Sequence, residues 1–101
     1  MAVHNGVAYL AEQVPADVSQ DIVGQTAQVL GVIDTLLARA GSDKTRILMC
    51  QILLRDLADF PGLNAACERW VALGHAPPRA TVVAALAKPE WRVEMVVTAA
   101  V

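Results

Sequence analysis

The run at residues 47–54 constrains this chain more than any other feature. Its sequence, Ile-Leu-Met-Cys-Gln-Ile-Leu-Leu, is apolar on both alternating faces, which is typical of a strand covered on both sides. We expect the strand to extend over residues 46–56. Helices of the same chain can cover one face, but 101 residues are enough for only one ordinary domain. The sequence therefore predicts that the second face needs a cover from outside the chain.

Composition supports the same expectation. Hydrophobic residues make up 55% of the chain and charged residues 18%, against about 45–50% and roughly 25% in an average domain. A subunit interface is the simplest place for this surplus, so we expect a homo-oligomer. The net charge of −2 and the scattering of eight basic residues argue against nucleic-acid binding. No apolar run reaches the 18 or so residues of a membrane span.

The N-terminus, MAVHNG, lacks the basic region and the cleavage site of a signal peptide, so we expect a cytoplasmic protein. Cys50 and Cys67 then belong to a reducing compartment. They have no histidine close by, so they do not match a zinc pattern, and we expect inert core thiols and no metal. The chain also lacks a phosphate-binding glycine loop and a dinucleotide fingerprint, which predicts that no cofactor is needed.

The periodicity of the chain predicts one α+β domain over residues 1–101 with the order ββαβαββ. Asn5-Gly6 is a hairpin signal between arms at 2–4 and 7–14, and a helix follows from an N-cap at Ser19 to a stop at Gly41. After the central strand we expect a helix capped by Asp59 and ending at Gly74, then strands at 80–86 and 91–101. The irregular alternation favours two helices on one face of a sheet over a doubly wound fold.

Two ionisable residues stand at positions where a charged side chain with a purely structural role would be unfavourable. Arg79 follows two prolines at the start of a strand, where its planar guanidinium would bind a carboxylate or form a salt bridge at the surface or an interface. Glu94 stands in the apolar final strand. It lies either on a solvated face or half-buried with a raised pKa, able to accept and return a proton. The residues themselves leave these alternatives open.

A series of short motifs runs nearly end to end through the chain. They are Gln13-Val14-Pro15, Gln25-Thr26, Ala40-Gly41-Ser42-Asp43, Asp56, Asp59-Phe60, Asn64, Pro78-Arg79-Ala80-Thr81, Val93-Glu94-Met95 and Ala99-Ala100. In order and interval this series resembles the RidA/YjgF family of imine deaminases, also called endoribonuclease L-PSP-like proteins. The pairing of a Pro-Arg strand start with a late Val-Glu strand is its most specific part.

The resemblance implies a chorismate-mutase-like fold and a homotrimer, in which the sheets line a central barrel and the helices lie outside. It implies hydrolysis of enamines and imines to 2-keto acids and ammonia, without a cofactor, in clefts between subunits. Arg79 would hold the carboxylate of a small substrate, and Glu94 would orient water and relay a proton. Thr81 and Ala11 would line the cleft, and Asn64 would lie near it.

Three features depart from the family pattern. Ala11-Glu12-Gln13 replaces the usual Ser-Gly or Ala-Gly before the glutamine, and Glu12 would repel a carboxylate ligand if it faced the cleft. Thr81 stands where the deaminase branch often has cysteine, and we expect the N-terminal segment that carries an aromatic residue over the cleft in many relatives to be missing or very short. The alternative function is therefore a non-catalytic trimer that binds small carboxylates through Arg79. Nuclease activity, attached to the family by name, is disfavoured by the acidic charge balance and the lack of a histidine pair.

Overall fold

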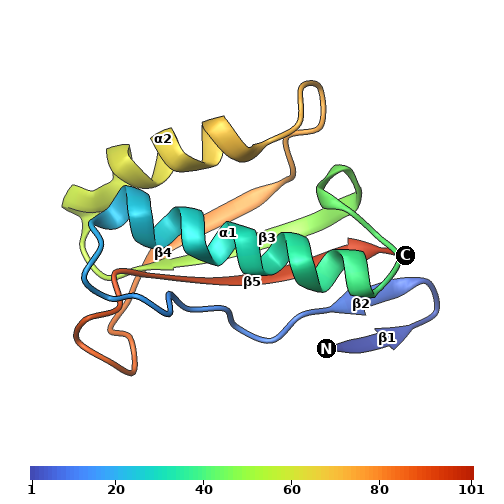
Figure 1. Cartoon of the computed structure of the whole chain (residues 1–101), viewed down its shortest axis with the longest axis horizontal. Helices are drawn as coiled ribbons and strands as arrows, with labels where there is room; N and C mark the ends of the chain where they lie inside the picture. Colours follow the sequence, from blue (N-terminus) through green and yellow to red (C-terminus); the bar gives the residue numbers. More distant parts are fainter.

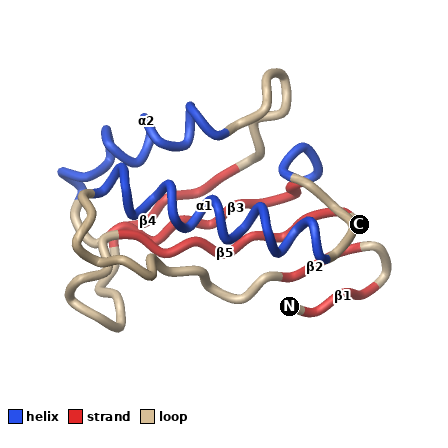
Figure 2. The backbone as a smooth tube through the Cα atoms, in the orientation of Figure 1, coloured by secondary structure: helices blue, strands red, loops and turns tan.

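In the computed structural model, which describes all 101 residues, two helices lie on one face of a five-stranded sheet (Figure 1, Figure 2). The elements are β1 (Ala2–His4), β2 (Val7–Tyr9), α1 (Ile22–Arg39), β3 (Ile47–Leu54), α2 (Phe60–Trp70), β4 (Arg79–Val83) and β5 (Val93–Ala100). Short 3-10 turns at Lys44–Arg46 and Leu57–Asp59 precede β3 and α2. The strand order is β1-β2-β5-β3-β4, and only the β3–β4 pair is parallel. The predicted α+β fold and element order are confirmed.

The opening hairpin forms at Asn5-Gly6, whose φ angles of +50° and +76° suit the tight turn that the pair predicts. Its second arm is shorter than the predicted 7–14, because β2 ends at Tyr9. The chain then follows the edge of β5 only loosely, and Gln13 forms an isolated bridge with Met95. Tyr9 pairs with Thr98 and Gln13 bridges Met95, so the three residues at 10–12 face only the two residues at 96–97. The extra residue makes this stretch bulge away from the edge of β5.

The boundaries of the two helices correct two predictions. The N-cap of α1 is Asp21, whose carboxylate accepts from the Gly24 N–H at 2.9 Å, whereas the predicted cap Ser19 bonds to Asp17 instead. Gly41, with φ of +76°, follows the end of α1 as predicted. The second helix ends at Trp70 rather than at Gly74, because the next residue is already extended.

The predicted strands at 80–86 and 91–101 are also too long. Arg55 explains much of the difference, because its guanidinium donates hydrogen bonds to carbonyl oxygens of the intervening loop. The acceptors are Leu86 at 3.1 Å, Lys88 at 2.7 Å and Trp91 at 2.8 Å. These carbonyls therefore bind a side chain, and the loop folds over Arg55 between β4 and β5.

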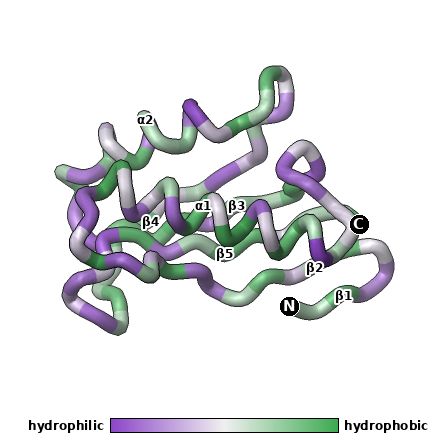
Figure 3. The backbone as a smooth tube through the Cα atoms, in the orientation of Figure 1, coloured by the Kyte–Doolittle hydropathy of each residue, from purple (hydrophilic) through white to green (hydrophobic).

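The core lies between the helices and one face of the sheet. Figure 3 shows hydrophobic residues along both β3 and β5. The inward residues of β5 alternate strictly, with Val93, Met95, Val97 and Ala99 buried. On the opposite face no element covers the sheet, and large side chains there are exposed, including Tyr9, Met49 and Val82 at 50%, 38% and 56%. No helix is both long and apolar enough to cross a membrane.

Candidate functional site

Arg79 begins β4 and pairs with Cys50 of β3, which places it on the face that the helices cover. The Cys50 N–H donates to the Pro78 carbonyl at 3.0 Å, so the double-proline loop is anchored directly before the arginine. The Arg79 guanidinium donates to the Asn64 side-chain oxygen on α2. The only ion pair within the chain joins Arg92 and Asp59. The positive charge of Arg79 therefore has no carboxylate partner in its own chain.

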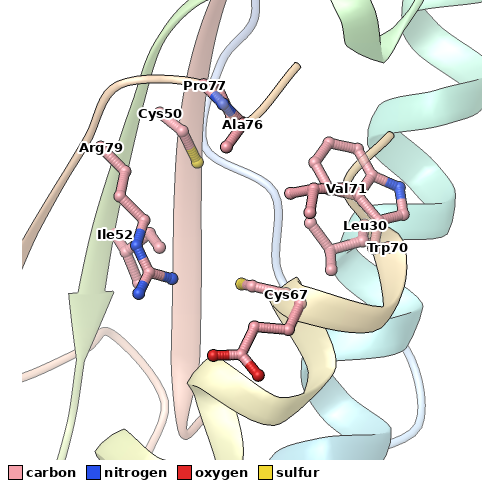
Figure 4. Close-up of a pocket in the computed structure, with 10 residues that line it drawn as sticks. Leu30, Cys50, Ile52, Cys67, Trp70, Val71, Ala76, Pro77 and Arg79 are labelled. Atoms are coloured by element: carbon pink, nitrogen blue, oxygen red, sulfur yellow. The ribbon is translucent and has the colours of Figure 1, made fainter. Parts of the chain in front are cut away.

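A cavity of about 200 Å³ opens beside Arg79, between α2, the sheet and the loop before β4 (Figure 4). It is mainly apolar and is lined by Leu30, Cys50, Ile52, Cys67, Glu68, Trp70, Val71, Ala76, Pro77 and Arg79. Burial raises the pKa of Cys50 to about 11, and burial is also the main cause that raises the pKa of Cys67. Both cysteines are free and buried. At neutral pH they are protonated thiols, which agrees with the predicted inert core role.

Glu94 lies on β5 beside Leu53, on the face of the sheet that no helix covers. It is half-buried. Burial is the first cause that raises the pKa of its carboxyl, and the negative charge of Glu12 is the second. Glu94 thus lies on the face open to solvent and is half-buried there, so the single chain combines features of both alternatives.

The predicted site residues fall into two groups. Asn64 and Arg79 are in contact, and Thr81 lies two residues farther along β4 on the same face. Glu94 lies on the other face with β3 between it and β4, and the exposed Ala11 follows the far edge of β5. A single chain thus does not bring Arg79 and Glu94 together.

The family model described as endoribonuclease L-PSP matches residues 1–101. This chain belongs to the endoribonuclease L-PSP family. A RutC family protein of Haemophilus ducreyi is 50% identical over 101 residues, which cover 100% of this chain and 86% of that protein. A crystal structure of a YjgF family member from Neisseria meningitidis gives a TM-score of 0.92 at 46% identity, over 95% of this chain and 80% of that one. The predicted RidA/YjgF resemblance is confirmed.

The 3-aminoacrylate deaminase RutC of Acinetobacter baylyi is a more distant relative of this L-PSP family chain. It is 29% identical over 97 residues, covering 90% of this chain and 76% of that protein. The name assigns deamination of 3-aminoacrylate to that relative.

Sequence reasoning missed the cavity, and Arg79 is the only one of its ten lining residues that was a predicted site residue. Cys67 and Trp70 are two of those it missed. Cys67 follows Asn64 by three positions on α2, so the two share a helix face, and this spacing was a signal that could have been used. Trp70 follows Cys67 by another three positions and offered the same signal. Its indole N–H donates to Asp34 of α1 at 2.9 Å, a contact that only the packing of the two helices creates.

Proposed function

We propose that this protein is a hydrolytic deaminase of reactive imines and enamines derived from amino acids, releasing 2-keto acids and ammonia. The observation that carries the proposal is Arg79, a guanidinium that faces an apolar cavity and has no carboxylate partner in its chain. Such a guanidinium can bind a substrate carboxylate through two parallel N–H···O bonds. A deaminase among the relatives supports the same class of reaction.

The reaction needs little from the protein. The carbon of an iminium ion is already electrophilic, so a positioned water and a proton relay suffice. As the water oxygen bonds to that carbon, its proton passes to the Glu94 carboxylate, which returns it to the nitrogen. The C–N bond then breaks and ammonia leaves, while the new hydroxyl group becomes the keto oxygen by giving its proton to the Glu94 carboxylate, which passes it to the ammonia. One iminium carboxylate and one water thus give one 2-keto acid and one ammonium ion. The raised pKa of Glu94 brings its proton affinity closer to what a relay needs near neutral pH.

We further propose that the active assembly is a homotrimer, as the family resemblance implies. Arg79 belongs to β4, the free edge of the sheet, whereas Glu94 and Ala11 lie toward its other side. A head-to-tail contact repeated around a closed ring can join two such different surfaces. Arg79 of one copy would then meet Glu94 of the next. The same ring would cover the exposed apolar face of the sheet.

A non-catalytic carboxylate binder is the second candidate, and Glu12 favours it. The charge of Glu12 is close enough to Glu94 to raise its pKa, and it would oppose a substrate carboxylate brought to the same place. In that case Arg79 would bind 2-keto acids without turnover.

Ammonia release from imines of alanine, generated in the assay by an amino-acid oxidase, tests the proposal. We expect Glu94→Gln to lower kcat by about a hundredfold or more, the usual contribution of a proton relay, and Arg79→Ala to raise KM strongly. Arg46→Ala, at an exposed arginine of the 3-10 turn, is the matched control and should leave both constants unchanged. Wild-type protein that is no faster than Arg79→Ala would refute deamination. Calorimetric binding of 2-keto acids without any turnover would select the binder.

Light scattering after size-exclusion chromatography tests the assembly. Val82→Lys puts a charge on the exposed sheet face and should yield monomers without activity. Val32→Lys makes the same change at a valine of α1 that is 39% exposed and lies on the other side of the molecule. It should leave the trimer intact. A wild-type monomer at micromolar concentration would contradict the ring.

A further inference from the structure

The cavity beside Arg79 forms an apolar chamber that the reaction steps described above do not use. Its walls come from both helices and the sheet, with Leu30 of α1, Ile52 of β3 and Trp70 at the end of α2. Figure 4 shows the Arg79 side chain reaching toward the same space as the sulfur atoms of Cys50 and Cys67. An apolar chamber with a cation at its side suits a ligand that is apolar at one end and anionic at the other.

Apart from Arg79, none of the polar groups that line the chamber carries a positive charge that could bind an anion. The Trp70 indole N–H donates to Asp34, and the Trp70 carbonyl accepts from the Lys44 ammonium at 2.6 Å. The two thiols are neutral, because burial raises their pKa values. Glu68 and Arg79, the two charged residues of the lining, are both exposed, and only Arg79 attracts an anion. Arg79 is thus the one group of the chamber left to orient a bound anion.

The size of the chamber indicates what it holds. A dry protein cavity of about 150 Å³ is large enough to bind benzene, and this one measures about 200 Å³. The methyl group of an alanine-derived imine would leave most of it empty. A branched four-carbon group or a phenyl ring would fill it. In a 2-imino acid the carboxylate is bonded to the carbon that carries the side chain, so a carboxylate at Arg79 puts that side chain at the chamber.

We propose that this chamber binds the substrate side chain, and that the substrates are 2-imino acids with bulky apolar side chains of leucine or phenylalanine size. The inference rests on the proposed function, because Arg79 would hold the carboxylate in both. The corresponding 2-keto acids, which carry the same two ends, should bind in the same way.

Calorimetry with two keto acids tests the chamber without any need for turnover. The keto acid of leucine carries three more side-chain carbons than pyruvate, and each buried methylene strengthens binding by about fourfold. We therefore expect its Kd to be at least about tenfold lower than that of pyruvate. Cys67→Phe fills the chamber and should bring this ratio to about one, whereas Cys67→Ala, which enlarges it, should keep the preference. Val32→Phe, on the exposed side of α1, is the control for adding a phenyl ring.

Thermal melting shows first whether Cys67→Phe folds, and Ala76→Leu fills the chamber from the loop if it does not. Equal Kd values for the two keto acids in the wild type, or an unchanged ratio after the chamber is filled, would overturn the inference. Failure of the proposed deamination and failure of the chamber assignment give different results. If the leucine keto acid binds preferentially but no imine is hydrolysed, deamination fails and the ligand class stands. If alanine and leucine imines are hydrolysed equally well by the wild type and the filled variants, deamination stands and the chamber assignment fails.

Discussion

Replacing Gln25 by leucine should lower the free energy of unfolding far more than the same change at an ordinary helix position would. Gln25 is 1% exposed. Its side-chain oxygen accepts from the Arg92 N–H at 2.8 Å, and its amide donates to the carbonyl of Glu90 at 3.0 Å. Two longer bonds, both 3.3 Å, reach the carbonyls of Val18 and Gln20. This one side chain therefore ties α1 to the loop that leads into β5.

The magnitude follows from the partners left behind. Gln25→Leu deprives the Arg92 N–H and the Glu90 carbonyl of bonds that are partly buried. An unsatisfied buried group costs about 1–3 kcal/mol, so each of these two should cost about 1–2 kcal/mol. Leucine keeps most of the side-chain volume, so little cavity cost is added. We expect the free energy of unfolding to fall by about 2–4 kcal/mol. For a domain of this size, that lowers Tm by roughly 10–25 °C.

Urea unfolding followed by tryptophan fluorescence, at one fixed protein concentration, measures the change. Gln28→Leu is the matched control, because Gln28 lies three positions further along α1 and also bonds a loop. It accepts from the Asp17 N–H at 2.8 Å and donates to the Asp17 carbonyl at 3.0 Å, at an exposed site where water can replace it. Its loss should cost less than about 1 kcal/mol. Equal destabilisation by the two variants would refute the reasoning.

Two further predictions concern helix packing and pH. Gly62→Ala would push a Cβ against Ile22 of α1 and should lower the free energy of unfolding by about 1–3 kcal/mol. Gly31→Ala has open space around the new Cβ and should raise the free energy of unfolding by up to about 1 kcal/mol. Urea unfolding that ranks the two variants the other way would contradict this. The pKa of Glu94 is raised above its ordinary value of 4.5, so its favourable contribution to folding is complete below about pH 4.5 and is lost as pH rises through the folded pKa. Glu94→Gln should therefore gain stability relative to the wild type at pH 8 but not at pH 4, and Glu12→Gln should lower the pKa of Glu94 in an NMR titration.

Local chemistry made much of the fold predictable. Asn5-Gly6 and Gly41 need positive φ angles, and the residue types alone indicate that. The residues at odd positions of β5 are all apolar, and this alternation by itself indicates the face that is buried. Predictions failed where a distant side chain took over, as when Arg55 bound the carbonyls that would have extended the last two strands. No local pattern reports a contact between residues more than thirty positions apart.

The sequence by itself determined the family, the element order and the two ionisable residues, Arg79 and Glu94, on which the proposed chemistry depends. Only the tertiary structure decided that the two lie on opposite faces of the sheet with β3 between them. The reason is strand register, since a shift of one residue turns every side chain to the other face and register is set by pairing between distant segments. The same packing opened the chamber beside Arg79, because its walls come from α1, α2 and β3. Its shape exists only once those elements meet.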